Sequence, residues 1–199
     1  MARPQAFNEE IVLESAMQLF WRQGFANTSV KDLTKATHLQ PGSIYAAFKN
    51  KRNLFLLSLD YYFENLYSAL SCILQSEEAP LKRIRHFFDY ILSQKNADKE
   101  LKSCLLVNTL LEMPPEDSEI NQRVSVMFTK IESEFSEVLK LAQKEGSLIS
   151  GGRPEAMAKM LMSGIFGLQV YNRMNPDPQG LVQIVNNLLA NLEKPDLKY

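Results

Sequence analysis

The stretch QPGSIYAAFKNK, residues 40–51, decides how the N-terminal part of the chain folds. Its proline and glycine are typical of a turn that opens a helix, because the N–H that proline lacks would have no helical partner at that position. At 100° per residue, Ile44 and Phe48 share one face of this helix. The opposite face carries small side chains and a cationic edge. The pattern therefore predicts a short helix over 41–48 with one apolar face and one nearly bare face.

Two helices are predicted before this stretch. The first contains an apolar stripe at a period of 3.6 residues, and Gly24 is placed to end it in a left-handed conformation. We expect Phe25 to fold back on Phe20 at that end. The second helix is predicted over 28–36. Thr28 or Ser29 is its N-cap, and a cap at Ser29 would give a capping box with Asp32.

The rest of the chain also has helical periodicity. Six further helices are predicted: one follows Pro80 and includes Ile84, Phe88 and Ile91, and the others cover about 52–75, 101–113, 116–145, 155–173 and 179–193. No alternation typical of a strand extends beyond a few residues, and no internal repeat is present. The fold class predicted is all-α, with three short helices followed by about six mostly longer ones.

Composition and charge indicate a soluble protein with one basic end. The chain has 199 residues, of which 45% are hydrophobic and 23% charged, values ordinary for a globular protein. No apolar run approaches the length that spans a bilayer and no secretion signal is visible, so we expect a cytoplasmic location. Residues 1–55 hold seven Lys and Arg against four Asp and Glu, a charge of +3, whereas the remainder holds 15 against 19, or −4. A basic end favours a polyanionic partner there.

The bare face of the 41–48 helix indicates what that partner is. A helix without bulky side chains on one face can bring its backbone close to another surface, and the major groove of DNA, about 12 Å wide, accepts a helix in this way. A helix-turn-helix would consist of the helix 28–36, the turn 37–40 and the recognition helix 41–48. The alternative is that the short helix only packs against its neighbours.

The whole string 7–55 resembles the DNA-binding domain of the TetR family of bacterial transcriptional regulators. Three motifs carry the resemblance: A-x-x-L-F-x-x-x-G-F at 16–25, T-S-V-x-D-L at 28–33 and G-S-I-Y-x-x-F-x-N-K at 42–51. The resemblance implies a three-helix helix-turn-helix DNA-binding domain over 1–51. It also implies a ligand-binding and dimerisation domain of about six helices over 52–199.

The resemblance also implies which residues contact DNA. These are Thr28, Ser29, Lys31, Gln40, Pro41, Gly42, Ser43, Tyr45 and Lys51. The chain departs from the family at Ala46 and Ala47, where many members carry a bulky aromatic residue or histidine. Base-edge hydrogen bonds from these two positions are therefore absent, although an alanine can contact a thymine methyl. We expect specificity to depend more on Gln40, Ser43 and DNA shape.

The C-terminal helices have features of a dimer interface. Gly164 and Gly167 allow close backbone approach, and a continuous apolar stripe follows in the helix 179–193. The family resemblance favours pairing of these helices with those of a second chain, in a four-helix bundle about a two-fold axis. The alternative is that they pack only within their own chain. Tyr, Phe and Met side chains between 55 and 175 favour either a ligand pocket or a plain core.

Cys104 is the candidate sensor residue. It lies in SCLLVNT, residues 103–109, which is similar to a G-C-L-L-V-N-T stretch of a TetR subfamily in which some members respond to electrophiles or oxidants through a cysteine. A helix N-terminus with Lys99 and Lys102 nearby would favour the reactive thiolate. The alternative is a buried, inert helical cysteine. Two cysteines in the whole chain do not suggest a disulfide framework.

An enzyme is disfavoured. The chain has two histidines, His38 and His86, and neither a phosphate-binding loop nor a dinucleotide fingerprint. We expect no catalytic residues, no cofactor and no metal site. The expected function is a homodimeric repressor that leaves a palindromic operator when a small molecule or a thiol-reactive compound acts on its C-terminal domain. The alternative is a DNA-binding structural or partner-controlled protein without a small-molecule ligand.

Overall fold

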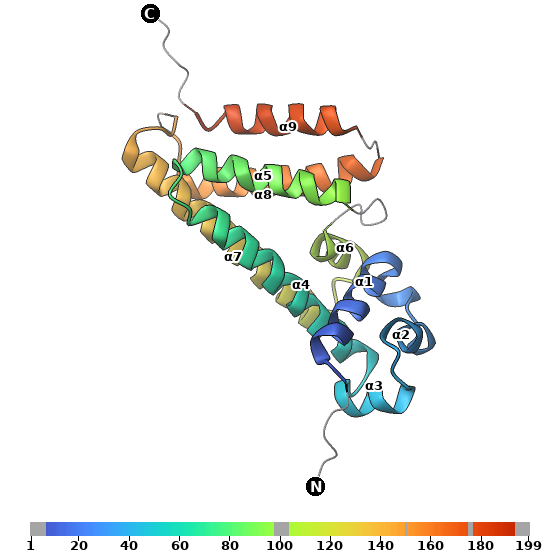
Figure 1. Ribbon diagram of the computed structural model, residues 1–199. Helices are drawn as coiled ribbons and strands as arrows, with labels where there is room; N and C mark the ends of the chain where they lie inside the picture. Colours follow the sequence, from blue (N-terminus) through green and yellow to red (C-terminus); the bar gives the residue numbers. More distant parts are fainter. Residues whose placement is uncertain (1–6, 98–103, 150, 175–176, 194–199) are drawn as a thin grey trace, which may run out of the picture. The chain divides into compact units, whose positions relative to one another are not determined.

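The structure is a computed structural model that describes residues 7–97, 104–149, 151–174 and 177–193. Its helices are α1 (Glu9–Asn27), α2 (Val30–Thr37), α3 (Pro41–Phe48), α4 (Lys51–Leu74), α5 (Pro80–Ala97), α6 (Leu105–Glu112), α7 (Ser118–Glu145), α8 (Pro154–Met174) and α9 (Pro178–Ala190) (Figure 1). The described residues form no strand beyond an isolated bridge between Leu148 and Glu193. The all-α class is confirmed, and α3 has the predicted bounds.

The chain divides into two compact units. The first comprises residues 1–66 and 105–124, and the second comprises residues 67–104 and 125–199. Both α4 and α7 contribute residues to each unit. The N-terminal unit thus includes α6 and the first turns of α7 in addition to the three short helices. The domain division after residue 51 stays a prediction.

Aromatic rings form the centre of the first unit. Phe20 and Phe55 are fully buried, with ring centroids 5.0 Å apart in an edge-to-face arrangement. Phe25 lies 4.9 Å from Phe55 and 6.3 Å from Phe20, so the predicted return of Phe25 onto Phe20 is confirmed. Aromatic pairs of this kind add about 0.5–1.5 kcal/mol to the burial of their area. They fix the end of α1 against α4.

The second unit has its own core. Phe87 on α5 meets Phe135 on α7 at 5.5 Å between ring centroids, and Phe128 on α7 meets Phe166 on α8 at 4.9 Å. Helix α9 runs alongside α5 and α8 (Figure 1). α7 ends where predicted, because Gly146 has a φ of 77° that breaks the helix.

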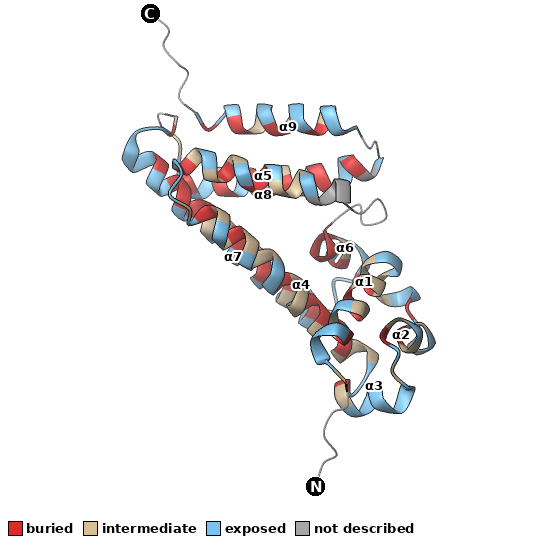
Figure 2. Cartoon of the chain, viewed as in Figure 1, coloured by how far each residue is buried: buried red, intermediate tan, exposed pale blue. Residues whose placement is uncertain are grey.

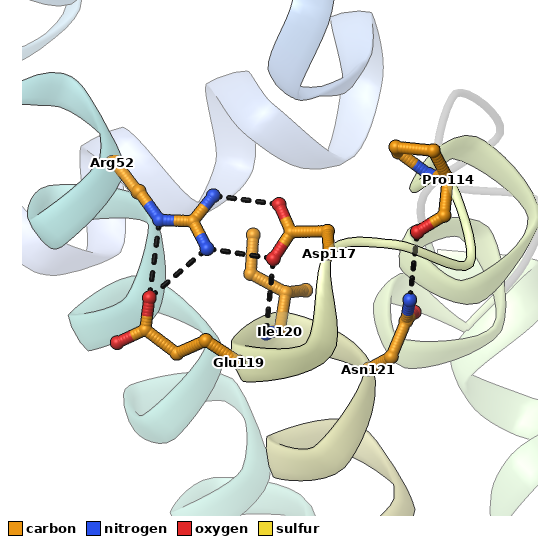
Figure 3. Close-up of polar contacts among 6 residues, drawn as sticks. All are labelled: Arg52, Pro114, Asp117, Glu119, Ile120 and Asn121. Carbon is orange, nitrogen blue, oxygen red and sulfur yellow. Dashed lines mark hydrogen bonds and ion pairs between the residues drawn. The ribbon is translucent and has the colours of Figure 1, made fainter.

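Arg52 ties the start of α4 to the start of α7 within the first unit (Figure 3). Its guanidinium donates two hydrogen bonds of 2.6 Å to the two oxygens of Asp117 and two more, of 3.1 and 2.9 Å, to Oε2 of Glu119. The Asp117 carboxylate also accepts the N–H of Ile120 at 3.3 Å and so caps α7. A planar fork that meets a carboxylate through two parallel bonds is the strong form of ion pair.

This ion pair predicts a pH-dependent stability. The hydrogen bond from Arg52 holds the pKa of Asp117 below its usual value. A depressed folded-state pKa stabilises the protein above the unfolded value of about 3.9, and this stabilisation is lost as the pH falls through the lower folded value. We expect Asp117→Asn to lower Tm by about 2–4 °C at pH 7. Thermal unfolding followed by circular dichroism between pH 3 and pH 8 should show this difference becoming smaller as the pH falls below about 4.

Glu116→Gln is the control, because Glu116 is exposed one residue earlier. It should have little effect on Tm. A Tm difference for Asp117→Asn that stays constant down to pH 3, or that is absent at pH 7, would show that the pair does not stabilise the fold.

Candidate nucleic-acid interface

Helix α3 uses only two side chains for the fold. Ile44 and Phe48 are fully buried, whereas the residues of its other face are exposed: Gln40, Pro41, Gly42, Ser43, Tyr45 and Ala46. Figure 2 shows α3 largely in the colour of exposed residues. Because one apolar pair anchors the helix, the rest of its surface is available to another molecule.

Gly42 leaves part of this surface without a side chain, although the fold does not require a glycine at this position. A Cβ atom added to Gly42 would meet no heavy atom within 4 Å. Its φ is not in the positive range that favours glycine. Neither packing around the Cβ position nor the backbone conformation therefore requires a glycine here.

The turn before α3 is held by local bonds. α2 ends at Thr37, one residue later than predicted, and His38 closes it with a φ of 57°. The Thr37 hydroxyl donates to the carbonyl of Leu33 at 2.7 Å and accepts the N–H of Leu39 at 3.4 Å. Since Leu33 and Ile44 are both fully buried, the angle between α2 and α3 is fixed by packing as well as by this turn.

The capping box predicted for α2 is confirmed. The backbone N–H of Asp32 donates to the Ser29 hydroxyl at 3.2 Å, and the N–H of Ser29 donates to the Asp32 carboxylate at 3.1 Å. The Ser29 hydroxyl also donates to Asp32 at 2.5 Å, and these bonds hold the pKa of that carboxyl below its usual value. Ser29 and Lys31 are exposed at the helix N-terminus, where main-chain N–H groups and the helix dipole favour an anion.

Two of the expected DNA contacts use their polar atoms in hydrogen bonds within the protein. Thr28 is 1% exposed, and its hydroxyl donates to the carbonyl of Gly24 at 2.6 Å. The ammonium of Lys51 donates to the carbonyls of Phe25 and Thr28, both at 2.9 Å, and lies 4.3 Å from the centre of the Phe25 ring. Both side chains therefore hold the connection between α1 and α2, which differs from the outward role expected from the resemblance. The other seven expected residues are exposed.

Sequence reasoning missed Glu112, at the end of α6. Its carboxylate accepts the N–H of Phe25 at 3.0 Å on Oε2 and the N–H of Ala26 at 2.7 Å on Oε1. A Cβ atom on Gly24 would lie 2.7 Å from Oε2, so this glycine leaves room for the carboxylate. No local pattern indicates this contact, because 86 and 87 positions separate the partners along the chain.

Exposed cations lie on α2 and directly after α3. Lys31 and Lys35 on α2, together with Lys49 directly after α3, are exposed. Lys49 follows α3 with a φ of 64° and donates its N–H to the carbonyl of Tyr45 at 2.9 Å. These ammonium groups suit contacts to phosphate oxygens, which set affinity and register without reading the base sequence.

Exposed apolar side chains on α8 and α9 make a second candidate surface. It consists of Val170, Tyr171, Met174 and Val182, beside the exposed Gly167. The two glycines of α8 differ in role. A Cβ atom on Gly164 would lie 2.3 Å from Leu188 of α9, so Gly164 serves packing within the chain, whereas a Cβ atom on Gly167 would meet nothing within 4 Å.

Cys104 is buried and directly precedes α6. The lysines expected to lie near it, Lys99 and Lys102, are outside the described residues. Cys72 on α4 is exposed. Across the part of the chain that the structure describes, no three His, Cys, Asp or Glu side chains gather into a possible metal site. No helix in the same part is both long and apolar enough to cross a membrane.

Known proteins similar to this chain are regulators of one family. The sequence pattern of the family described as bacterial regulatory proteins, tetR family, matches residues 12–57, and that of the tetracyclin repressor-like C-terminal domain matches residues 80–188. The HTH-type transcriptional repressor ComR of Escherichia coli K12 is 26% identical over 188 residues, which are 94% of this chain and 90% of ComR. The HTH-type transcriptional repressor DhaR of Mycobacterium sp. GP1 is 22% identical over 187 residues, 92% of each chain.

A solved structure shares the fold over nearly the whole chain. It is a cysteine mutant of the TetR family transcriptional regulator CifR in complex with 26-bp double-stranded operator DNA. It superposes with a TM-score of 0.85 at 25% identity and covers 94% of this chain and 98% of that one. The family patterns, the relatives and the exposed face of α3 agree. The chain belongs to the TetR family of bacterial regulatory proteins, which are helix-turn-helix transcriptional regulators.

Proposed function

We propose that the protein is a repressor that binds a palindromic operator as a homodimer and leaves it when an effector acts on the C-terminal region. The observation that carries the DNA-binding part is the bare face of α3, where Gly42 has open space that the fold does not use. The relatives ComR and DhaR are named repressors, and CifR was solved on operator DNA.

In this proposal α3 enters the major groove with its small side chains toward the bases. Gln40 and Ser43 donate or accept hydrogen bonds at base edges, and Ala46 contacts a thymine methyl. Tyr45, which is 48% exposed, contacts phosphate or sugar. Ser29 and Lys31 bind phosphate at the N-terminus of α2.

Members of this family act as dimers, and we assign the pairing surface to α8 and α9. The exposed apolar residues Val170, Tyr171, Met174 and Val182 would be covered by the same residues of the second chain. The open space at Gly167 would allow the two copies of α8 to approach closely. A two-fold axis there would present two copies of α3 to half-sites one helical turn apart, about 34–36 Å.

The effector part of the proposal concerns a small molecule or a thiol-reactive compound. An effector lowers operator affinity only by the difference between its affinities for the DNA-bound and released conformations. Cys104, buried just before α6, is the candidate thiol, and an inert structural cysteine is the competing role. A regulator without any small-molecule ligand is the competing function. Operator affinity that no metabolite or oxidant changes would favour that alternative.

Selection of genomic fragments by the purified protein, read by sequencing, tests the proposed function. We expect enrichment of one palindrome. Tyr45→Ala should abolish the enrichment without lowering Tm, because this side chain is exposed and its loss leaves no cavity. Uniform recovery of fragments by the wild type, or equal enrichment by the variant, would contradict a sequence-specific regulator that uses this face.

Because of the open space at Gly42, we expect a larger residue there to weaken DNA binding without lowering the stability of the protein. Gly42→Leu should leave Tm unchanged or slightly higher, because leucine favours helix more than glycine does and its Cβ atom meets no heavy atom within 4 Å. It should weaken binding to the selected palindrome at least tenfold, roughly 1.4 kcal/mol, because the side chain would occupy the space between helix and groove.

Gly42→Ala is the graded control and should weaken binding less than leucine does. Fluorescence anisotropy with a labelled duplex measures both affinities. Wild-type affinity in Gly42→Leu, or a loss accompanied by a lower Tm, would show that α3 does not approach DNA through this face.

Lys51 and Lys31 are expected to differ in the salt dependence of binding. Each phosphate contact contributes about −0.9 to the slope of log K against log salt. Lys31→Met should reduce that slope by about this amount at unchanged Tm, since Lys31 is exposed. Lys51→Met should leave the slope unchanged and lower stability by about 1–3 kcal/mol, since it leaves two carbonyls without their donor. A reduced slope in Lys51→Met would show instead that its ammonium contacts phosphate.

A further inference from the structure

The connection between α1 and α2 is held by a carboxylate and an ammonium from helices outside the helix-turn-helix. We call residues 24–28 the connection: they are the last turn of α1 after its break at Gly24, together with Thr28. Glu112 of α6 accepts two adjacent N–H groups of the connection, and Lys51 of α4 donates to two of its carbonyls. Phe25 has its N–H bound by the anion and its carbonyl bound by the cation. All of these residues belong to the first compact unit.

The carboxylate replaces helical hydrogen bonds that the connection cannot make. Gly24 has φ 79° and ψ 167°, values outside the helical region. A residue in this conformation interrupts the i to i−4 bonds, so the next N–H groups along the chain need other acceptors. The two oxygens of Glu112 supply acceptors for Phe25 and Ala26 at 3.0 and 2.7 Å.

The position of the connection sets the position of the DNA-binding surface. Ser29, which caps α2, follows the connection directly. α2 and α3 are in contact, and each buries an apolar side chain, Leu33 and Ile44, in the core of the first unit. A shift of the connection is therefore carried to the exposed face of α3.

We propose that Glu112 is a positioning residue for operator binding: through its bonds to Phe25 and Ala26, it fixes the orientation in which α2 and α3 meet DNA. Glu112 is on α6, within the C-terminal region that the repressor-like pattern matches, and belongs to neither α2 nor α3. The inference rests on the proposed binding of a palindromic operator.

Whether DNA affinity rises or falls when Glu112 loses its charge distinguishes a positioning role from simple repulsion of the DNA phosphates. A carboxylate near a DNA-binding surface repels phosphates, so its removal alone raises DNA affinity. Positioning predicts the opposite, because loss of the two bonds allows α2 and α3 to leave the required orientation. Glu116, exposed in the loop after α6, provides a matched control, since Glu116→Gln removes the same charge without touching the connection.

The experiment compares the full-length wild type with Glu112→Gln, Glu112→Asp and Glu116→Gln. Binding to a labelled duplex carrying the selected palindrome and to a scrambled duplex is measured by anisotropy at two salt concentrations. Hydrogen exchange followed by mass spectrometry reports the amides of residues 25–33. Tm is recorded for every variant.

We expect Glu112→Gln to bind the palindrome at least tenfold more weakly and the scrambled duplex no more weakly than the wild type. Its amides at 25 and 26 should exchange at least tenfold faster, with Tm lowered by less than about 4 °C. Glu112→Asp keeps the charge but shortens the side chain, so its affinity for the palindrome should lie between those of the wild type and Glu112→Gln. Glu116→Gln should bind both duplexes as tightly as the wild type or more tightly.

Three results would overturn the inference. They are wild-type or tighter palindrome binding by Glu112→Gln, unchanged exchange at residues 25 and 26, and an affinity loss that the fraction of unfolded protein accounts for. If the wild type itself shows no preference for any palindrome, the proposed function fails, whereas the exchange data still decide whether Glu112 holds the connection.

Discussion

The break in α1 at Gly24 is the constraint on which the DNA-binding end of this protein depends. It releases main-chain groups that an uninterrupted helix would pair internally. Those groups are satisfied by Glu112 from α6, far away in the sequence, and by Lys51 at the start of α4, so hydrogen bonds join the helix-turn-helix to both helices. The aromatic cluster of Phe20, Phe25 and Phe55 closes the same region with apolar contacts.

In this arrangement, some residues stabilise the fold and others are exposed and free to contact DNA. α3 is anchored by Ile44 and Phe48 alone. Arg52, through its fork with Asp117, fixes the start of α4 directly after the recognition helix. The outward face of α3 can therefore be small and polar without a loss of stability, which is the combination that close approach to a DNA groove requires.

Local patterns predicted much of this fold. The capping box of Ser29 and Asp32, the bounds of α3 and the end of α7 at Gly146 depend on neighbouring residues and were foreseen correctly. The partners of Glu112 and Arg52 were not foreseen, because 65–87 positions separate the bonded groups and no periodicity reports such contacts.

Side-chain roles were harder to predict than helices. Motif resemblance marks Thr28 and Lys51 as important but does not distinguish a contact to DNA from a bond to the protein's own carbonyls. Likewise, Gly164 and Gly167 look alike in the sequence, yet the structure uses only Gly164 for packing within the chain. In both cases tertiary packing decides the role: it determines which groups a side chain bonds to and whether the space at a glycine is filled by the same chain.

Methylation interference on the selected genomic fragment tests the central claim most directly, because it reports major-groove guanine N7 and minor-groove adenine N3 separately. A dimer that inserts two copies of α3 should be blocked by N7 methylation in two half-sites whose centres are about 10–10.5 base pairs apart. Interference confined to the minor groove, or to a single half-site, would contradict the account.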